Sequence, residues 1–547
     1  MPPSAQPAPV STPSPEAAAL AHRRTLRALI ALLLALFAAT LSSTVVSIAL
    51  PEIIGALEGT QTQYTWVITA ALLTATASTP IWGKLADLFD KKSLIQVAIG
   101  IFVLASVGAG FSQDAGQLIA FRAVQGLGVG GLQALVQIAI AAMIPPRERG
   151  RYSGYQSAAT AMATIGGPLL GGLIADTPWL GWRWCLFVGI PVAAVALVEL
   201  QRALNLPVVR RARVRIDYAG ATLIAAGVSL LLIWITFVGN SFAWISWPSA
   251  AMVGGTVALL GLAVVVEARS PEPVVPLRIV AQRTTALAIL GSLAVGTAMF
   301  GGAVFLGQYF QIARGYAPVE AGLLTVPLML GLLVSSVVGG RLISRTGRIK
   351  PFIVAGTVAL TGGFALLAFI DHTTSLGYLG VAMFLVGTGI GVTLQNLVLV
   401  VQNTVALADI GSASSTVSFF RSLGGTIGVS VLGAVLARQV ASNVTAGLRE
   451  AGYPTSGNVS SSLDVGALPG PVQEIVRAAY GDATGHIFAI AAGVAVVSIV
   501  AAVLLRPAPL RRSLDLPDAG TAVTVAAGAA TAAPPLDEVR IEPSARR

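Results

Sequence analysis

The sequence predicts an all-α membrane protein with fourteen transmembrane helices, and three observations lead to this fold class. Hydrophobic residues make up 55% of the 547-residue chain and charged residues only 11%, whereas a soluble domain carries about 25% charged residues. Apolar runs of about 20 residues, the length that spans a bilayer as a helix, recur along the chain. Basic residues gather in alternate connections between these runs, which is the positive-inside pattern of membrane proteins.

Each apolar run is predicted to be helical, because lipid offers the backbone N–H and C=O groups no other hydrogen-bond partner. The first run is too long for a cleaved secretory signal and further runs follow it, so it is predicted to be the first membrane helix. The fourteen predicted spans are 28–50, 63–82, 93–112, 117–143, 155–175, 184–203, 217–239, 248–268, 285–311, 320–340, 352–370, 378–402, 413–437 and 483–505.

The distribution of lysine and arginine predicts the orientation of the chain in the membrane. The N-terminal flank and the connections after even-numbered helices carry most of the basic residues, whereas the short connections on the other side hold only Arg183 and Arg314. Connection 403–412 departs from this pattern, since it carries Asp409 and no basic residue. With an even helix count, the asymmetry predicts that both termini are cytoplasmic. The Arg-, Ala- and Gly-rich composition indicates a bacterium, and therefore its inner membrane.

The order of spans and polar stretches predicts five parts along the chain. The two tails are rich in Pro, Ala and Gly and are predicted to be disordered. The predicted parts are a cytoplasmic tail (1–24), a six-helix bundle (25–205), two inserted helices (206–270), a second six-helix bundle (271–505) with a long outside connection (438–482), and a cytoplasmic tail (506–547).

Composition and motifs exclude several classes of function. The net charge is +10, but the basic residues lie between apolar runs and form no aromatic-laced patch for nucleic acid. Cys185 is the only cysteine and the three histidines are far apart, so no metal site is expected. The sequence contains no G-x-x-x-x-G-K-[ST] motif for nucleotide phosphates. We therefore expect a protein that is not an enzyme, has no cofactor, and takes its energy from a gradient or a partner.

Two connections repeat one pattern and indicate that the chain is built from two related halves. The connection after the second helix reads GKLADLFDKK over residues 83–92, and the one after the tenth reads GRLISRTGRIK over 340–350. Both place a glycine, an apolar pair and then a basic cluster on the cytoplasmic side. Two six-helix halves would place these connections six helices apart, but here they are eight apart, which predicts two inserted helices between the halves.

The connection after the second helix also carries a recognisable motif. Compared with the pattern G-x-L-A-D-R-x-G-R-K, this chain differs at Leu88 and Asp90. In this and in the following motifs the sequence resembles the major facilitator superfamily, and within it the fourteen-helix drug:proton antiporters. The residues of the chain that match this loop motif are Gly83, Leu85, Ala86, Asp87, Lys91 and Lys92.

Further motifs follow in the order that the resemblance requires, over roughly residues 25–505. The fourth helix carries R-x-x-Q-G-x-G, the fifth carries an antiporter motif ending in G-P-x-x-G-G, and the thirteenth carries R-S-L-G-G-x-x-G. The central glycine of the antiporter motif is Ala163 here. The matching residues are Arg122, Gln125, Gly126 and Gly128 in the fourth helix, Gly154, Gly167, Pro168, Gly171 and Gly172 in the fifth, and Arg421, Gly424, Gly425 and Gly428 in the thirteenth.

The resemblance implies that Asp87 holds the two halves together on the cytoplasmic side, the alternative being a solvated loop charge. Lys91 and Lys92 are expected to serve topology and lipid contact. For Arg122 and Arg421 we weigh a role in coupling or substrate contact against a structural arginine bonded to backbone carbonyls.

The glycines and the proline of the fifth helix imply a pivot, with small-residue packing as the alternative. Among polar groups on the apolar helices we expect some to line a cavity. These candidates are Ser42, Ser43, Gln125, Gln133, Gln137, Gln308, Gln311, Gln395 and Asn396.

One departure concerns the proton. The first-helix motif L-D-x-T-I-V-N-V-A-L-P of the antiporters has an aspartate that is a candidate proton carrier, and this chain has Ser42 at that position and Ser47 at the asparagine position. No Asp or Glu falls in the middle of a predicted span. Glu52, near the outer end of the first helix, is the remaining candidate for proton coupling, with an interfacial charge as the alternative.

The expected function is secondary active transport by alternating access, exporting lipophilic or cationic drugs or natural products by proton antiport. The expected partners are a small substrate, protons and the lipid bilayer, for a monomeric protein that binds no nucleic acid. One alternative is a dedicated exporter of a single endogenous metabolite, such as an antibiotic or a siderophore. A non-transporting membrane sensor is the alternative from another class.

Overall fold

The structure is a computed structural model, and apart from one isolated bridge between Val238 and Phe242 its regular elements are all helical. The predicted all-α class is therefore confirmed, and each of the fourteen predicted spans coincides with one helix or with two consecutive ones. The model describes residues 15–59, 61–175, 177, 181–204, 217–239, 242–316, 318–452, 469–507 and 509–511.

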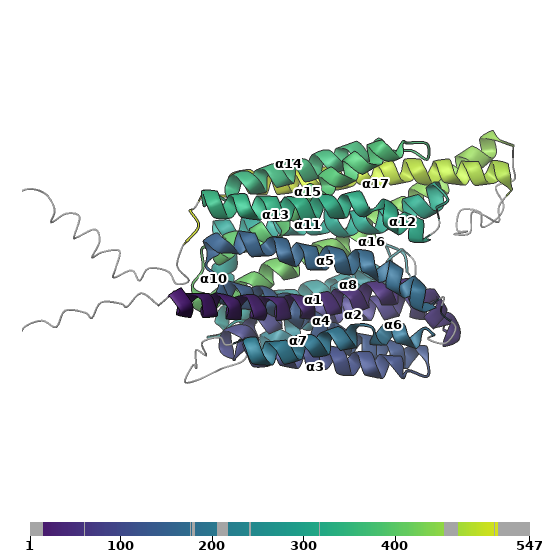
Figure 1. Cartoon of the computed structure of the whole chain (residues 1–547). Helices are drawn as coiled ribbons and strands as arrows, with labels where there is room; N and C mark the ends of the chain where they lie inside the picture. The colour runs from purple at the N-terminus through teal and green to yellow at the C-terminus, as the bar shows by residue number, and fades with distance from the viewer. Residues whose placement is uncertain are drawn as a thin grey trace, which may run out of the picture.

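The helices form two groups that lie side by side with two further helices outside them (Figure 1). The first helix group comprises α1 (Pro15–Ala56), α2 (Gln61–Leu88), α3 (Lys91–Gly110), α4 (Ala115–Met143), α5 (Pro146–Ala175), α6 (Arg183–Phe187) and α7 (Gly189–Ala203). The outer pair comprises α8 (Tyr218–Phe237) and α9 (Trp247–Arg269).

The second helix group follows a short helix, α10 (Leu277–Val280). It comprises α11 (Arg283–Gln308), the π-helical turn η1 (Tyr309–Ala313), α12 (Pro318–Leu324), α13 (Val326–Thr346), α14 (Lys350–Leu367), α15 (Leu376–Gln402), the 3₁₀ turn η2 (Leu407–Asp409), α16 (Ile410–Glu450) and α17 (Gly470–Leu504). We call the end of the molecule where α1 begins and α17 ends the terminal end; it lies at the left of Figure 1.

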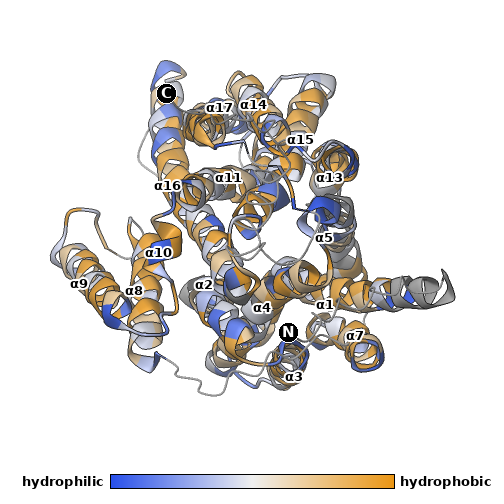
Figure 2. Cartoon of the chain, turned by 90° about the vertical axis from the view of Figure 1, so that its left-hand side faces the viewer, coloured by the Kyte–Doolittle hydropathy of each residue, from blue (hydrophilic) through white to orange (hydrophobic). Residues whose placement is uncertain are grey.

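Each helix group has its own apolar core. Buried side chains of α1, α3, α4 and α7, such as Phe102 and Leu135, pack together in the first group, and those of α11, α14, α15 and α17, such as Phe364 and Phe488, pack together in the second. The groups meet where α2 packs on α16 and α5 packs on α13, on either side of the centre of the end-on view (Figure 2).

Twelve helices in the described part of the chain are long and apolar enough to cross a membrane. The two other predicted spans, 63–82 and 155–175, are helical as α2 and α5 but are not among these twelve. Both helices extend into charged stretches at the terminal end, and both supply the contacts between the groups. Their polar and small residues therefore belong to protein interfaces and reduce the hydropathy.

The outer pair lies beside the contact between α2 and α16 (Figure 2). Helix α8 packs on both of these helices, and α9 packs on α8. Apolar side chains of α9, including Val257 and Val264, are exposed, as expected for a helix that faces lipid.

The outside connection expected over 438–482 is shorter than predicted, because helices fill much of it. α16 continues to Glu450 and α17 already begins at Gly470. Val440, Val444 and Leu448 recur every fourth residue and pack against Val472 and other side chains of α17. This stripe stabilises a helical hairpin whose average hydropathy is too low for a predicted span. The remainder, 453–468, lies outside the described residues.

Both predicted tails are partly structured. α1 begins at Pro15, so the tail expected over 1–24 is helical in its last residues, and residues 1–14 lie outside the described residues. The tail expected from 506 onward begins with a segment that contacts the bundle, in which Leu510 is buried. Residues 512–547 lie outside the described residues.

Candidate functional site

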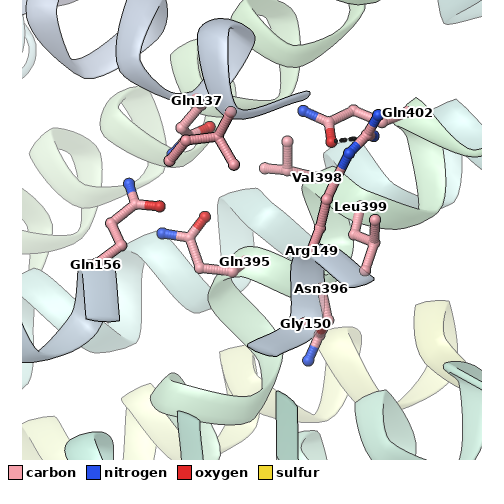
Figure 3. A pocket seen from close by; sticks show the side chains of 10 residues that line it. Gln137, Arg149, Gly150, Gln156, Gln395, Asn396, Val398, Leu399 and Gln402 are labelled. Carbon is pink, nitrogen blue, oxygen red and sulfur yellow. Dashed lines mark hydrogen bonds between the residues drawn. The ribbon is translucent and has the colours of Figure 1, made fainter. Parts of the chain in front are cut away.

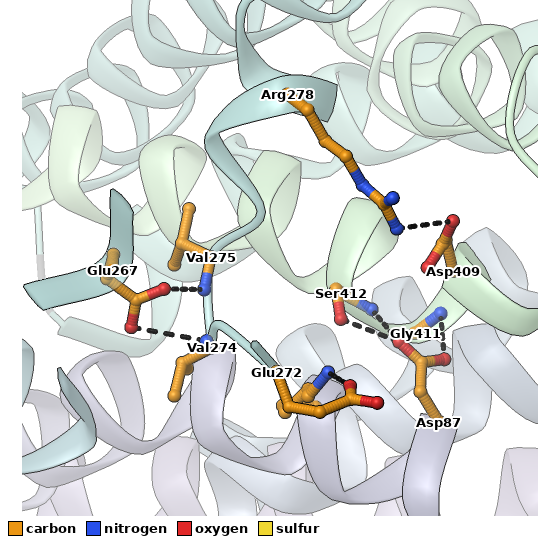
Figure 4. A network of polar contacts seen from close by, with 10 residues as sticks. Asp87, Glu267, Glu272, Val274, Val275, Arg278, Asp409, Gly411 and Ser412 are labelled. Atoms are coloured by element: carbon orange, nitrogen blue, oxygen red, sulfur yellow. Dashed lines mark hydrogen bonds and ion pairs between the residues drawn. The ribbon is translucent and has the colours of Figure 1, made fainter. Parts of the chain in front are cut away.

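Asp87, near the end of α2, accepts hydrogen bonds from the first turn of α16 in the other helix group (Figure 4). Its Oδ1 accepts from the backbone N–H of Gly411 at 2.8 Å. Its Oδ2 accepts from the N–H and the hydroxyl of Ser412, at 2.8 and 2.6 Å. The first N–H groups of a helix have no partner within the helix and carry partial positive charge, so a carboxylate is well placed there. Asp87 thus joins the two groups at the terminal end.

Gly83 lets α2 approach α16 closely enough for this contact. A Cβ atom at Gly83 would lie 1.9 Å from Oγ of Ser415 and 2.8 Å from the carbonyl oxygen of Gly411, which no real side chain tolerates. Asp87 lies beyond the predicted span 63–82, and burial raises the pKa of its carboxyl group to about 6, although the hydrogen bonds and the charge of Lys91 act in the opposite direction.

The two lysines of the loop motif have different surroundings. Lys91 begins α3, and its charge favours the ionised form of Asp87. Lys92 Nζ donates to the carbonyl oxygen of Gln201 at the end of α7, at 2.7 Å, within the first helix group. The structure therefore brings Gly83, Asp87 and Lys91 to the contact between the groups, and it places Lys92 away from it.

The segment that leads from α9 to α10 is fixed to α2 beside this contact (Figure 4). Lys84 Nζ lies 2.6 Å from Oε2 of Glu272. The carboxylate of Glu267, at the end of α9, accepts from the N–H groups of Val274 and Val275 at 3.2 and 3.0 Å. The outer helix pair is thus linked to the helix that carries Asp87.

A second contact between the groups is made by arginines at the start of α5. The Arg149 side chain is buried and donates to the carbonyl oxygens of Ile144 and Ala141 at 2.6 and 2.5 Å, and to Oε1 of Gln402 in α15 at 2.8 Å. Arg149 precedes the predicted span 155–175, and burial lowers the pKa of its guanidinium to about 9. Arg147 donates to the carbonyl oxygens of Ser344 and Arg345 at the end of α13, both at 3.2 Å.

The segment that follows α17 contacts both helix groups at the terminal end, through its described residues 505–507 and 509–511. We call it the C-terminal strap. Arg511 Nη2 donates to the carbonyl oxygens of Gln402 and Val405 at 2.7 and 3.0 Å, and its N–H donates to Oδ1 of Asn403 at 3.0 Å. The carbonyl oxygen of Arg511 accepts from the N–H of Arg147 at 3.1 Å. The strap therefore contacts both groups.

A small polar pocket lies between α4, α5 and α15 (Figure 3). Its volume is about 40 Å³, which is room for water and far below the size of a drug-binding cleft. Gln137, Gln395 and Asn396, three of the candidates for a cavity, line it. The other lining residues are Ile140, Arg149, Gly150, Gln156, Val398, Leu399 and Gln402.

Deeper in the first group, the fourth-helix motif forms a buried network. Arg122 donates through Nη1 to Oε1 of Gln125 and through Nε to the carbonyl oxygen of Val67. Gln125 Nε2 lies 2.7 Å from Oγ of Ser106 and 3.5 Å from Oγ of Ser42. The network joins α1, α2, α3 and α4, and it brings together three predicted site residues: Ser42, Arg122 and Gln125.

The remaining predicted site residues lie apart from this network. Arg421 is on α16, where a Cβ at Gly296 of α11 would lie 2.0 Å from the Arg421 carbonyl oxygen. Gly167 packs on α1, since a Cβ there would lie 2.2 Å from Oγ1 of Thr44, and Gly171 is buried in the same helix. The side chains of Glu52, Pro168 and Gly172 lie outside the described residues, although their backbones belong to α1 and α5.

Sequence comparison identifies the family to which this arrangement belongs. Residues 32–429 match the model of the Major Facilitator Superfamily. The chain belongs to the major facilitator superfamily. It is therefore a membrane transporter and not an enzyme.

Members of the superfamily from bacteria are similar over most of the chain. An uncharacterised MFS-type transporter of Mycobacterium tuberculosis is 33% identical over 480 residues, which cover 88% of this chain and 69% of that protein. The multidrug transporter protein MdtP of Bacillus subtilis is 33% identical over 407 residues, 74% of each chain. The fold also matches the solved structure of the proton:xylose symporter XylE, with a TM-score of 0.57 and 14% identity over 90% of this chain and 98% of that one.

Several contacts of this transporter could not be identified from the sequence. Arg149 and Arg511 are read there as topological charges, and Glu272 as part of a connection. Of these residues only Gln402 could be noticed in the sequence, because an amide at the end of a long apolar helix needs a polar partner. The partner of Arg149 comes from the other helix group, 253 residues away along the chain.

Proposed function

We propose that this transporter exports lipophilic drugs or natural products from a bacterial cell by alternating access, driven by proton antiport. The name of one relative supports this proposal, since the Bacillus subtilis protein is called a multidrug transporter protein. In this proposal the two six-helix bundles are residues 25–205 and 271–505, and α8 and α9 are inserted between them. α2 and α5 complete the fourteen spans, because both are bundle helices that pack at the interface.

The terminal end is proposed to face the cytoplasm. The basic residues of the connections gather there, and those with described contacts include Lys84, Lys92, Arg147 and Arg345. An excess of Lys and Arg marks the cytoplasmic side of a membrane protein. The proposed location is then the inner membrane, with both termini inside the cell.

The observation that carries the proposal is the bonding of Asp87 to the first turn of α16 across the two groups. For the cytoplasmic side to open, this contact and the Arg149–Gln402 contact must both break. Two packed bundles that separate at one end while remaining joined elsewhere alternate the access to a site between them. The structure would then represent the state that is closed toward the cytoplasm.

Coupling is proposed to involve the buried network of Arg122 and Gln125. This network reaches Ser42, the position of the candidate proton carrier in the antiporters, and a serine does not ionise there. Glu52 on the same helix is the proposed proton site, and Arg421 is proposed to act in substrate contact. The sequence lacks a nucleotide-binding motif, which supports a gradient as the source of energy.

The test is dye efflux from a pump-deficient bacterium that expresses the full chain. Cells are loaded with ethidium, Nile red or fluorescein, which are cationic, neutral and anionic, and are then energised. We expect efflux of at least one dye above the vector control, its loss on adding a protonophore, and its loss in Arg122→Ala. The matched control is Arg449→Ala, an exposed arginine near the tip of α16. Glu52→Gln then tests the proton site.

Two outcomes would contradict the proposal. If no dye leaves faster than in the control while the protein is confirmed in the membrane, export of varied lipophilic compounds is wrong, and a dedicated exporter of one metabolite becomes the better explanation. If efflux persists in the presence of the protonophore, proton coupling is wrong.

A further inference from the structure

Arg122 and Arg421 lie inside the predicted spans 117–143 and 413–437, and neither side chain pairs with a carboxylate in the described part of the chain. The ion pairs found there involve other residues. Arg122 is satisfied by neutral oxygens of Val67 and Gln125. Nη1 of Arg421 is buried and has no hydrogen-bond partner among the described residues. Of these two arginines, Arg421 is therefore the one with a buried donor that is still available to an anion.

Arg421 lies on the face of α16 that points into the interface between the groups. Ser414 and Ser418 precede it by seven and three residues, so all three share one face of the helix. Ser414 Oγ accepts from Gln402 Nε2 at 2.9 Å, and Ser418 Oγ donates to Oε1 of Gln137 at 3.2 Å. Gln137 belongs to α4 in the first group and lines the polar pocket (Figure 3). Arg421 therefore lies about one turn along α16 from Ser418, which bonds to a residue of that pocket.

The polar side chains that line this pocket are neutral amides and the cation Arg149. Gln137, Gln156, Gln395 and Asn396 line the pocket together with Arg149, and the lining contains no carboxylate. Oδ1 of Asn396 is buried without a hydrogen-bond partner in the described residues. Amides bind carbonyl and hydroxyl groups, while the two arginines make the interior attractive to anions and repulsive to cations.

We propose that the transported substrates are lipophilic organic acids, whose anionic group pairs with Arg421 while the amides bind their neutral polar groups. This inference rests on the proposed export function and narrows its substrate class, since it replaces the lipophilic or cationic compounds expected from the sequence. A guanidinium binds a carboxylate with two parallel hydrogen bonds, which a lysine does not reproduce.

Binding of three matched ligands tests the inference. The ligands share a dansyl fluorophore and an alkyl chain and end in a carboxylate, a methyl ester or a primary ammonium. Full-length protein in nanodiscs of zwitterionic lipid is titrated with each at pH 7.5. We expect the carboxylate to bind about 30-fold more tightly than the ester, as for a buried charge pair that has lost one partner, and the ammonium to bind most weakly.

Variants assign this preference to Arg421. Arg421→Gln is expected to weaken binding of the carboxylate ligand to the level of the ester and to leave binding of the ester unchanged. Arg421→Lys is expected to retain part of the preference for the carboxylate. Arg449→Gln, on the exposed end of the same helix, is expected to change nothing. The inference is overturned if the ammonium or the ester binds as tightly as the acid, if the acid does not bind, or if Arg421→Gln keeps the preference. The comparison of ligands on the unmodified chain stands even where a variant fails to fold.

Transport of the same ligands into proteoliposomes separates the inference from the function on which it rests. If the acid binds preferentially but is not transported when a proton gradient is imposed, the export proposal fails and the anion site stands. If the ammonium is transported and the acid is not, the anion site is wrong and the export proposal stands.

Discussion

Asp87 accepts two hydrogen bonds from Ser412, one from its N–H at 2.8 Å and one from its hydroxyl at 2.6 Å. Ser412→Ala removes only the second of these and keeps the helix. A hydrogen bond to a charged group is worth about 1.5–3 kcal/mol. We therefore expect the ratio of closed to open molecules to fall roughly tenfold. Spin labels at Arg202 and Arg348, exposed residues of different helix groups, placed after Cys185→Ser, would report this as a longer distance. Thr222→Ala, which loses an exposed hydroxyl bonded within its own helix, α8, is the control, and equal distances in both variants would contradict the prediction.

Gly83→Ala should separate α2 from α16. The added methyl group would overlap Oγ of Ser415, and an overlap with a packed neighbour costs about 1–3 kcal/mol or more. We expect normal amounts of protein in the membrane but a large loss of efflux, because the terminal end no longer closes. Gly100→Ala is the matched control, since a Cβ at this membrane-helix glycine has nothing within 4 Å. Efflux at the unmodified rate in Gly83→Ala would show that this close approach is not required.

The closed state should become more populated as the pH falls from 7.5 to 5. Burial raises the pKa of Asp87 to about 6 in the closed state, whereas a solvated aspartate in the open state has a pKa of about 3.9. The closed state therefore binds the proton more tightly, and linkage predicts about a tenfold shift toward it over this range. The shift begins as the pH falls below about 7 and continues to about pH 3, below both pKa values. The same pair of spin labels measures the shift. Asp87→Asn should remove it, and an opening on acidification would refute the assignment.

Arg511→Ala should weaken the closed state through the C-terminal strap. The variant loses the bonds of its guanidinium to the carbonyl oxygens of Gln402 and Val405, and bonds from a charged donor contribute about 1.5–3 kcal/mol each when buried, less where water competes. We expect faster accessibility of a cysteine introduced at Gln395, which lines the polar pocket, to a membrane-impermeant thiol reagent, in inside-out vesicles of the Cys185→Ser background. Arg506→Ala, an exposed residue of the same segment, should leave the rate unchanged. An effect of similar size in both variants would mean that charge alone is responsible.

The positions of the helices could be predicted because lipid imposes a single requirement, a run of about 20 apolar residues. Within this rule α16 and α17 were underestimated, since their protruding parts are stabilised by a stripe such as Val440 and Val444 and not by average hydropathy. The helix α1 also begins earlier than its apolar run, at Pro15.

The candidate site was predictable only where a local motif records it. Asp87 and Gly83 belong to such a motif, and so do Arg122 and Gln125. The partner of Asp87 is a set of backbone N–H groups at the start of α16, which no side-chain pattern encodes. Arg149 and Gln402 are likewise 253 positions apart, and only the packing of the two groups brings them together.

The uninterrupted length of α16 has a mechanical consequence. Its 41 residues extend over roughly 60 Å at 1.5 Å per residue, about twice the thickness of the hydrocarbon layer. One end holds Asp87, and the other forms the protruding hairpin with α17 (Figure 1). A rigid rod transmits a tilt at one end to the other, so the tip of the hairpin moves whenever the distant end is released. An antibody fragment that recognises only one position of this tip would therefore hold the transporter in one state while binding far from the Asp87 contact.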